Sequence, residues 1–314
     1  MSSSSHPNAC RTRRPVDSAT SPALCHGSGI TRRGDVGGNP WYEPSFPPGV
    51  PIDNEPITVD LGPEAYPVRR WRHLVDGVEY IFLHAPALYE RPGIYESGGR
   101  SYPDNAIRFG VMCRAAVDFA TERGVDLLHA NDWHASLAVR WFDGPTMMTV
   151  HNLMYQGVFA RQWLEFLGLD DDDFDDKTGE FHGQLNLLKL GLVSADVVTT
   201  VSEAYAEEIL TPEFGCGLEG VLANDVKRLV GIRNGIGPEW DPARDRFLPA
   251  MFSSYQLDGK RACRTALLDR LSLHALETDP VIGVIGRITE QKGYDMIVEA
   301  LHRVLPDHRA TVVL

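Results

Sequence analysis

"DLLHANDWHASLAVRWFDGPTMMTVHN", residues 126–152, holds two short apolar runs on either side of a segment of helical length. The runs DLLHA and TMMTV have the length of strands, and polar residues follow each of them at once. A third such run, DVVTTV, begins at Asp196, and an earlier one, EYIFLHAP, covers residues 79–86. Strands that alternate with helical stretches predict an α/β fold with a parallel sheet.

Residues 104–124, DNAIRFGVMCRAAVDFATERG, predict a long helix between the strand at residues 79–86 and the strand that begins at Asp126. Asp104 is expected to cap its start and Gly124 its end. Its apolar residues recur at helical spacing and form one stripe: Ile107, Val111, Ala115 and Phe119, with Met112 and Ala116 beside them.

The segment RLVGIRNGIGPEWDPARD, residues 228–245, indicates a joint between two domains, because Pro238 and Pro242 prevent a helix from continuing the preceding strand. After it we expect a helix, then VIGVIGR as a strand buried on both faces, a helix with its stripe from Tyr294 to Val304, and a last strand, ATVVL. Two strands and two helices are too few to enclose a core. We therefore predict an unstructured tail (1–43), a first domain (44–232), a joint (233–245) and the start of a second domain (246–314), in a chain cut short.

The composition excludes several classes of protein. The chain has 314 residues, 43% of them hydrophobic, and a formal net charge of −13, which argues against a nucleic-acid partner. No apolar stretch approaches the roughly 20 residues of a membrane helix, so we expect a soluble chain without a membrane partner. Five scattered cysteines without a CxxC spacing favour a reducing compartment, the bacterial cytoplasm, and no structural zinc. The Arg- and Ser-rich, acid-poor start leaves a plastid transit peptide as the alternative.

In an open α/β sheet, ligands bind beyond the carboxyl ends of the strands. Polar residues that follow the predicted strands therefore form two candidate half-sites, one in each domain: Asn131, Asp132, His134, His151, Asn152, Ser202 and Asn234 in the first, and Arg287 and Lys292 in the second.

Several of these residues have a structural interpretation as well. Ser202 is most simply a helix N-cap, and Asp132 could cap a helix that starts at Trp133. His151 alone could be a hydrogen-bonded structural histidine. The six aspartates between positions 170 and 176 lack the spacing of a metal-binding loop and indicate a solvated, mobile acidic loop without chemistry.

Arg287 and Lys292 are harder to explain structurally. Two cations beyond a strand, close to the N-terminus of the next helix, suit a phosphate group. The chain contains neither GxGxxG nor GxxxxGK[ST], so the anion would be held by side chains.

These motifs together resemble the bacterial glycogen synthase and plant starch synthase family from about residue 79 to the C-terminus. The resemblance is carried by HANDWHASLAVRW, TVHNLMYQGVF, GQLNLLKLGLVSADVVTTVSEAYAEEILTPEFGCGLEGVL, GIRNGI with EWDPARD, and VIGVIGRITEQKGYD. It implies a GT-B fold of two Rossmann-like domains: the first, acceptor-side domain complete or nearly so, and the start of a second that binds the nucleotide-sugar. It also implies transfer of glucose from ADP-glucose to the non-reducing end of an α-1,4-glucan, with retention and without a cofactor or essential metal.

The resemblance also implies roles for individual residues. Arg287 and Lys292 match the pair that binds the donor diphosphate and serves catalysis. His151 matches the catalytic histidine of the VHN motif near the transferred glucose, and Asp132 the aspartate of HDWH.

Two further residues match substrate-binding positions of the family. Asn234 corresponds to the asparagine of its LNG motif, and Tyr95 to the tyrosine of RPG-x-Y.

The chain departs from the family pattern in four places. HDWH is NDWH here, with Asn131, and LNGID is RNGIG, with Arg233 and Gly237. No KTGGL-type glycine loop precedes the matched region, and the acidic motif EPCGL is absent. We therefore expect little turnover by this chain alone. The alternatives are a non-catalytic remnant that binds glucan or a partner, and a related GT-B transferase that uses another donor.

Overall fold

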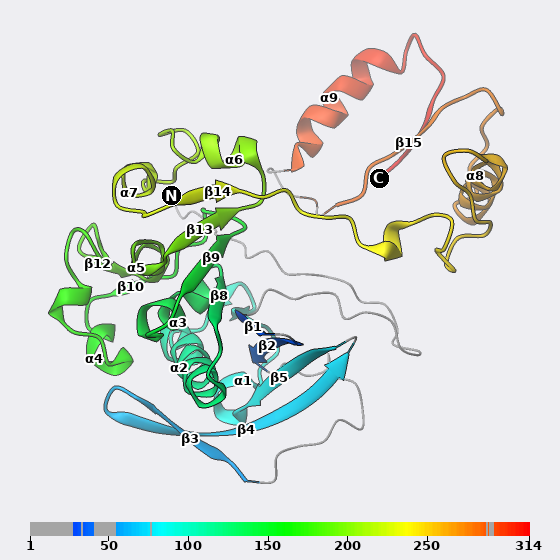
Figure 1. Ribbon diagram of the computed structural model, residues 1–314. Helices are drawn as coiled ribbons and strands as arrows, with labels where there is room; N and C mark the ends of the chain where they lie inside the picture. The colour runs from blue at the N-terminus through cyan, green and yellow to red at the C-terminus, as the bar shows by residue number, and fades with distance from the viewer. Residues whose placement is uncertain (1–27, 33, 41–54, 76, 287, 289–291) are drawn as a thin grey trace. The chain divides into compact units, whose positions relative to one another are not determined.

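The computed structural model describes residues 28–32, 34–40, 55–75, 77–286, 288 and 292–314. The chain forms two compact units that meet at the peptide bond between Asn234 and Gly235. The first unit is built on a nine-stranded sheet with the strand order β14-β13-β9-β8-β1-β2-β5-β4-β3 (Figure 1). No helix formed by the described residues has the length and hydropathy needed to cross a membrane.

The predicted parallel sheet is confirmed in one half of this nine-stranded sheet. β8 (Leu127–Asn131), β9 (Thr146–Val150), β13 (Val197–Thr200) and β14 (Leu229–Gly231) pair in parallel, so their carboxyl ends lie at one edge. The register sets Asn131 opposite Thr149, and Thr149 opposite Thr199. Residues at the ends of these strands are thereby brought together although 100 positions separate the end of β8 (131) from the end of β14 (231).

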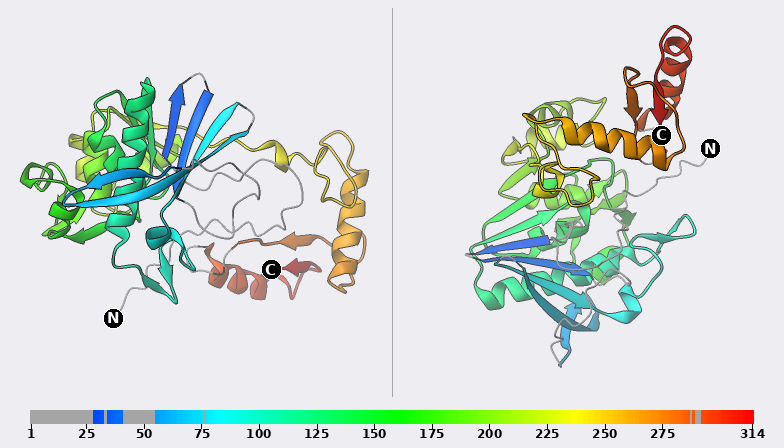
Figure 2. Two further views of the ribbon diagram at one scale, coloured as in Figure 1. Left: turned by 90° about the horizontal axis from the view of Figure 1, so that it is seen from below. Right: turned by 90° about the vertical axis from the view of Figure 1, so that its right-hand side faces the viewer.

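The other half of the sheet is largely antiparallel, which the sequence pattern did not predict. β1 (Ser28–Arg32), β2 (Gly34–Pro40), β3 (Ile57–Leu61), β4 (Glu64–Val75) and β5 (Val78–His84) belong to it. β1 and β2 form a hairpin between β8 and β5, and only the β2–β5 pair among these strands is parallel (Figure 2).

This hairpin makes the predicted tail wrong for residues 28–32 and 34–40. Its glycine-rich sequence has no apolar alternation that would mark a strand. The strands form through main-chain pairing with β8 and β5, whose inner edges would otherwise carry unpaired N–H and C=O groups. Residues 1–27 of the predicted tail lie outside the described residues.

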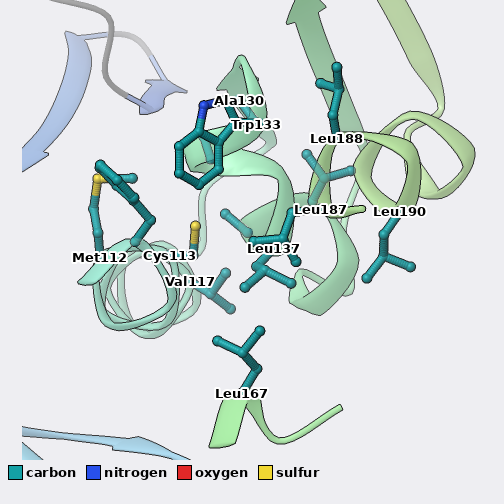
Figure 3. Close-up of a cluster of buried hydrophobic side chains, with 14 of the residues drawn as sticks. Met112, Cys113, Val117, Ala130, Trp133, Leu137, Leu167, Leu187, Leu188 and Leu190 are labelled. Atoms are coloured by element: carbon teal, nitrogen blue, oxygen red, sulfur yellow. The ribbon is translucent and has the colours of Figure 1, made fainter. Parts of the chain in front are cut away.

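The core of the first unit lies between this sheet and three helices. α3 (Ser136–Trp141) packs on β8 and β9 and is flanked by α2 (Asn105–Arg123) and α5 (Leu187–Ser194). Figure 3 shows where their side chains meet, with Val117 of α2 and Leu137 of α3 among the labelled residues. The predicted apolar stripe of α2 is buried along its whole length.

The two predicted caps of α2 have different outcomes. Gly124 ends the helix in the left-handed conformation, with φ 56°, and its N–H bonds to the carbonyl of Ala120, as predicted. Asp104 makes no side-chain cap bond. Its carboxylate instead accepts two hydrogen bonds of 2.7 Å from Arg91, since a bidentate ion pair is stronger than one bond to a neutral amide.

Shorter elements complete the first unit: α1 (Pro86–Tyr89), β6 (Glu96–Ser97), β7 (Arg100–Ser101), η1 (Trp133–Ala135), β10 (Val158–Ala160), α4 (Trp163–Leu167), η2 (Asp171–Asp173), β11 (Glu180–Phe181), β12 (Gln184–Asn186), α6 (Glu203–Glu208) and α7 (Glu219–Asn224).

The acidic loop around η2 is more structured than the solvated segment that we expected. Asp170 and Asp173 form a reciprocal capping box, and the buried carboxylate of Asp173 accepts a 2.6 Å hydrogen bond from Arg140. Lys189 of α5, 4% exposed, donates from Nζ to the main-chain carbonyls of Asp176 and Glu180. A buried ammonium and two hydrogen-bonded aspartates thus hold a loop whose composition alone indicates repulsion.

The second unit contains the four elements that the sequence predicted, α8 (Asp258–Arg270), β15 (Val281–Gly283), α9 (Tyr294–Val304) and β16 (Thr311–Val313), after a short η3 (Pro238–Trp240). β15 pairs in parallel with β16. The expectation that β15 is buried on both faces is wrong, because Ile282 is 42% exposed and Ile285, just beyond it, is fully exposed. Two strands and two helices leave most apolar side chains of this unit in contact with solvent.

Candidate functional site

Asp132 follows β8 directly and has an unusual main-chain conformation. Its φ of 55° and ψ of −179° lie in a region that is nearly reserved for glycine. The residue is 7% exposed, and its N–H donates to the carbonyl of Thr149 on β9 at 2.9 Å. Pairing with β9 therefore continues for one residue past the strand and holds Asp132 in a strained conformation.

The carboxylate of Asp132 does not cap the helix that follows it. η1 begins at Trp133 without a side-chain cap bond. Oδ1 of Asp132 instead accepts a 2.8 Å hydrogen bond from the main-chain N–H of His151. Of the two interpretations left open by the sequence, helix capping is therefore wrong, and the carboxylate joins the ends of β8 and β9.

The imidazole of His151 is held by the residue before Asp132. Nε2 of His151 lies 2.9 Å from Oδ1 of Asn131. Two consecutive residues at the end of β8 thus hold His151, one through its main chain and the other through its ring. The structure brings the candidates Asp132 and His151 together, and it shows a contact between Asn131 and His151 that the sequence motif did not reveal.

A row of polar side chains on the same face of the sheet leads up to this point. Oγ1 of Thr149 lies 2.6 Å from Oγ1 of Thr199 and 2.6 Å from Nε2 of His129. Burial and, secondarily, the nearby His151 lower the pKa of His129. The neutral form of the His129 ring is therefore favoured.

Tyr95 stacks on His134, with ring centroids 4.9 Å apart and planes 26° from parallel. Its main-chain carbonyl accepts hydrogen bonds from the side chain of Asn105 and from the N–H of Tyr102, each 3.0 Å long. The structure therefore brings Tyr95 to the residue two positions after Asp132, on a segment with a defined main-chain conformation.

Arg108 of α2 holds the main chain of the segment that contains Tyr95. The residue is fully buried, and its guanidinium donates to the carbonyls of Leu88 and Ile94 at 2.7 Å and to Oδ1 of Asn105 at 2.6 Å. An arginine inside an apolar helical stripe gives no signal of this role in the sequence, because the acceptors are main-chain atoms.

The remaining candidates of the first unit do not join this cluster through any described contact. Ser202 caps α6, since its Oγ accepts a 3.0 Å hydrogen bond from the N–H of Tyr205, and this confirms its structural interpretation. Asn234 is exposed, three residues after β14. Arg233 lies 3.4 Å from Glu203 in an exposed ion pair.

Of the two predicted donor-binding cations, Arg287 lies outside the described residues. Lys292 is exposed and precedes α9, and Gly293 between them has a φ of 63°. Oη of Tyr294 donates a 3.1 Å hydrogen bond to the carbonyl of Gly286, so the start of α9 is joined to the residue before Arg287. None of the ion pairs between described residues involves Lys292.

A cavity of about 530 Å³ lies at the opposite ends of the parallel strands, where Thr146 begins β9. Its cations are engaged, because Arg140 bonds to Asp173 and Lys227 to Asp196 at 2.9 Å. This position is remote from the carboxyl ends of the strands, so the cavity is not a part of the candidate site.

Comparison with known proteins supports the family resemblance that the sequence motifs indicate. Residues 42–224 match the family described as the starch synthase catalytic domain. The glycogen synthase of Paracidovorax citrulli (strain AAC00-1) is 43% identical over 248 residues, which are 73% of this chain and 49% of that protein. The glycogen synthase of Anaeromyxobacter dehalogenans (strain 2CP-C) is 38% identical over 275 residues, covering 83% of this chain and 58% of that protein.

A solved structure is similar as well. The catalytic domain of starch synthase IV from Arabidopsis thaliana, bound to ADP and acarbose, superposes with a TM-score of 0.78 and 27% identity over 88% of this chain and 60% of that one. The chain spans about half the length of the curated relatives it matches. With well over half of its residues matched, the chain belongs to the starch synthase catalytic domain family, and its fold is an α/β fold of the GT-B type.

Proposed function

We propose that the chain carries the acceptor-side half of a glycogen (starch) synthase, an enzyme that transfers glucose from ADP-glucose to the non-reducing end of an α-1,4-glucan with retention. The observation that carries this proposal is the fixed pair of Asp132 and His151 at the carboxyl ends of β8 and β9. The family relationship supports it, as do relatives named glycogen synthase and a similar structure that contains ADP.

The reaction places its main demand on electrostatics. As the bond between glucose and ADP breaks, negative charge grows on the diphosphate while the sugar approaches an oxocarbenium ion. In our proposal Arg287 and Lys292 meet the diphosphate, and cations at that place stabilise the transition state more than the ground state. Removing one of them is expected to cost about 3 to 4 kcal/mol of transition-state stabilisation, on the scale of a lost oxyanion donor.

On the sugar side, Asp132 and His151 are proposed to orient the hydroxyls of the transferred glucose. Their geometry is set before substrate arrives, because main-chain pairing and two short hydrogen bonds hold both residues. Tyr95 and Asn234 are proposed to contact the substrates as well. Positioning of this kind contributes to the rate without a protein nucleophile, and displacement of a positioned group by about 1 Å can cost about 100-fold.

The proposal is tested by binding and transfer together. Calorimetry with the purified chain measures binding of maltoheptaose and of ADP-glucose. Transfer of labelled glucose to glycogen is measured for the chain and for a chimera that continues it with the remaining part of the Paracidovorax citrulli relative. We expect transfer by the chimera with ADP-glucose, and a loss of about 100-fold in its His151→Ala variant. His302→Ala, at an exposed position of α9, is the matched control.

Three results would count against the proposal. Absence of binding to both ligands would refute it. Transfer that prefers UDP-glucose would identify a related transferase with another donor. Glucan binding by the chain with a folded but inactive chimera would favour a non-catalytic binding protein. For an enzyme that uses a soluble nucleotide-sugar, we propose the cytoplasm as its compartment.

A further inference from the structure

The end of β8 fixes the position of the Asn131 side chain on the same sheet face as Thr149. The two residues are register partners in parallel strands of the sheet core. Oδ1 of Asn131 lies 2.9 Å from Nε2 of His151, while Oδ1 of Asp132 holds the main chain of His151 at 2.8 Å. The imidazole therefore cannot turn away without breaking its contact with Asn131, while Asp132 fixes the main chain from which the ring extends.

From this geometry we infer that Asn131 is a positioning residue that holds His151 as the neutral tautomer with its proton on Nε2. A carbonyl oxygen can only accept a hydrogen bond, so the ring nitrogen that faces Oδ1 must be the donor. The proton on Nε2 then leaves Nδ1 without one in the neutral ring.

Two ionisable groups lie close to His151. The carboxylate of Asp132 accepts a hydrogen bond from its main-chain N–H. His129, on the same face of the sheet, has a pKa lowered by burial and, secondarily, by the nearby His151, so a positive charge on both rings at once is disfavoured. The uncharged amide of Asn131 attracts an imidazolium less than a carboxylate in its place would.

The tautomer decides what kind of substrate atom the ring can meet. An unprotonated Nδ1 accepts hydrogen bonds and cannot donate one, so its partner in a complex must be a donor such as a sugar hydroxyl. A diphosphate oxygen at the same point would face a lone pair and be repelled. This consequence rests on the proposed function: it assigns His151 to the sugar and not to the diphosphate of the donor.

The tautomer is read directly by long-range ¹H–¹⁵N NMR spectra of the full chain labelled with ¹⁵N-histidine, without substrate. Spectra are recorded at about pH 8, above the ordinary imidazole pKa of about 6.5. The signals of His151 are assigned by their loss in His151→Gln. We expect the pattern of a single tautomer protonated on Nε2 in the native chain.

Two substitutions of Asn131 test whether its acceptor oxygen sets the tautomer of His151. Asn131→Asp keeps an acceptor oxygen, and we expect the same tautomer in this variant. Asn131→Ala removes the acceptor, and we expect signals of both tautomers. Asn152→Ala is the matched control, because that asparagine follows the next strand but accepts from the N–H of Met154. It should leave the His151 tautomer unchanged.

A native His151 protonated on Nδ1, or an Asn131→Ala variant with the native pattern, would overturn the inference. If Asn131→Ala does not fold, as judged by circular dichroism, the native chain and Asn131→Asp still decide, since mixed tautomers in either contradict it. The spectra are recorded without substrate, so the predicted tautomer can be refuted while glucose transfer is observed. Equally, the tautomer can be confirmed while no transfer is observed. The inference and the proposed function are therefore tested separately.

Discussion

Replacement of Asp132 by alanine and by glycine should reverse the usual order of stability of these two residues. In both variants His151 loses the carboxylate that accepts its main-chain N–H, a bond to a charged group worth about 1.5 to 3 kcal/mol. Alanine keeps the backbone strain at φ 55° and ψ −179°, whereas glycine relieves it, by about 1 to 3 kcal/mol.

Glycine also carries a cost of about 0.5 to 1 kcal/mol relative to alanine, because it has more freedom in the unfolded chain. The difference between these ranges predicts that Asp132→Gly is more stable than Asp132→Ala by up to about 2.5 kcal/mol, with a central value of about 1 kcal/mol. The free energies of unfolding are measured by urea titration with tryptophan fluorescence, in which the buried Trp133 reports on the first unit.

The matched control is Glu122, an exposed residue of α2. There the ordinary order should hold, with alanine more stable than glycine by about 1 kcal/mol. If alanine is also the more stable residue at position 132, the conformation of Asp132 is not strained, and the argument that the fold holds this carboxylate in place against a backbone cost is refuted.

Three further predictions concern the half-buried His129 and the buried Arg108 and Lys189. The pKa of His129 is lower in the folded chain than in the unfolded chain, so as the pH falls the unfolded chain is protonated at this ring first. The contribution of His129 to the free energy of unfolding should therefore be complete above about pH 6.5 and decrease below it. His129→Gln should reduce this pH dependence in urea titrations across the same range. Arg108→Met should lower the free energy of unfolding by about 3 kcal/mol, because two buried acceptors and one partly buried acceptor lose their donor. Lys189→Met should cost about 1.5 to 3 kcal/mol and expose residues 170–182 to limited proteolysis, detected by mass spectrometry of the fragments.

Each of these has a control on the surface. His302→Gln should leave the pH dependence unchanged, and an unchanged slope in His129→Gln itself would contradict the lowered pKa. Arg123→Met removes a partly exposed arginine and should cost less than about 1 kcal/mol. Lys177→Met changes an exposed lysine of the acidic loop, and cleavage equal to that of Lys189→Met would show that the buried ammonium does not hold the loop.

Local patterns in the sequence predicted the parallel half of the sheet and the long helix α2. Short apolar runs and a stripe at helical spacing report burial directly, since each depends on neighbours within a few positions. The same runs also located Asp132 and His151 at strand ends. Here the rule that ligands meet the carboxyl ends of parallel strands converted a sequence position into a place in the fold.

Interactions with main-chain atoms escaped prediction, because any residue type can supply a main-chain partner. The hairpin of β1 and β2 forms by main-chain pairing, Arg108 donates to two carbonyls, and the carboxylate of Asp132 accepts from an N–H. The exposed β15 shows a second reason why a sequence pattern can fail to predict burial. Its apolar residues favour burial, yet burial requires neighbours that two strands and two helices do not supply.

The sequence by itself determined the family, the candidate residues at the strand ends, and which segments form strands and helices in the parallel half of the sheet. Only the tertiary structure decided that Asp132 bonds to His151 instead of capping a helix, and that Asn131 faces the imidazole. The reason is physical: propensity and periodicity act along the chain, whereas the partner of a polar side chain is set by the register between strands that lie about twenty residues apart in sequence.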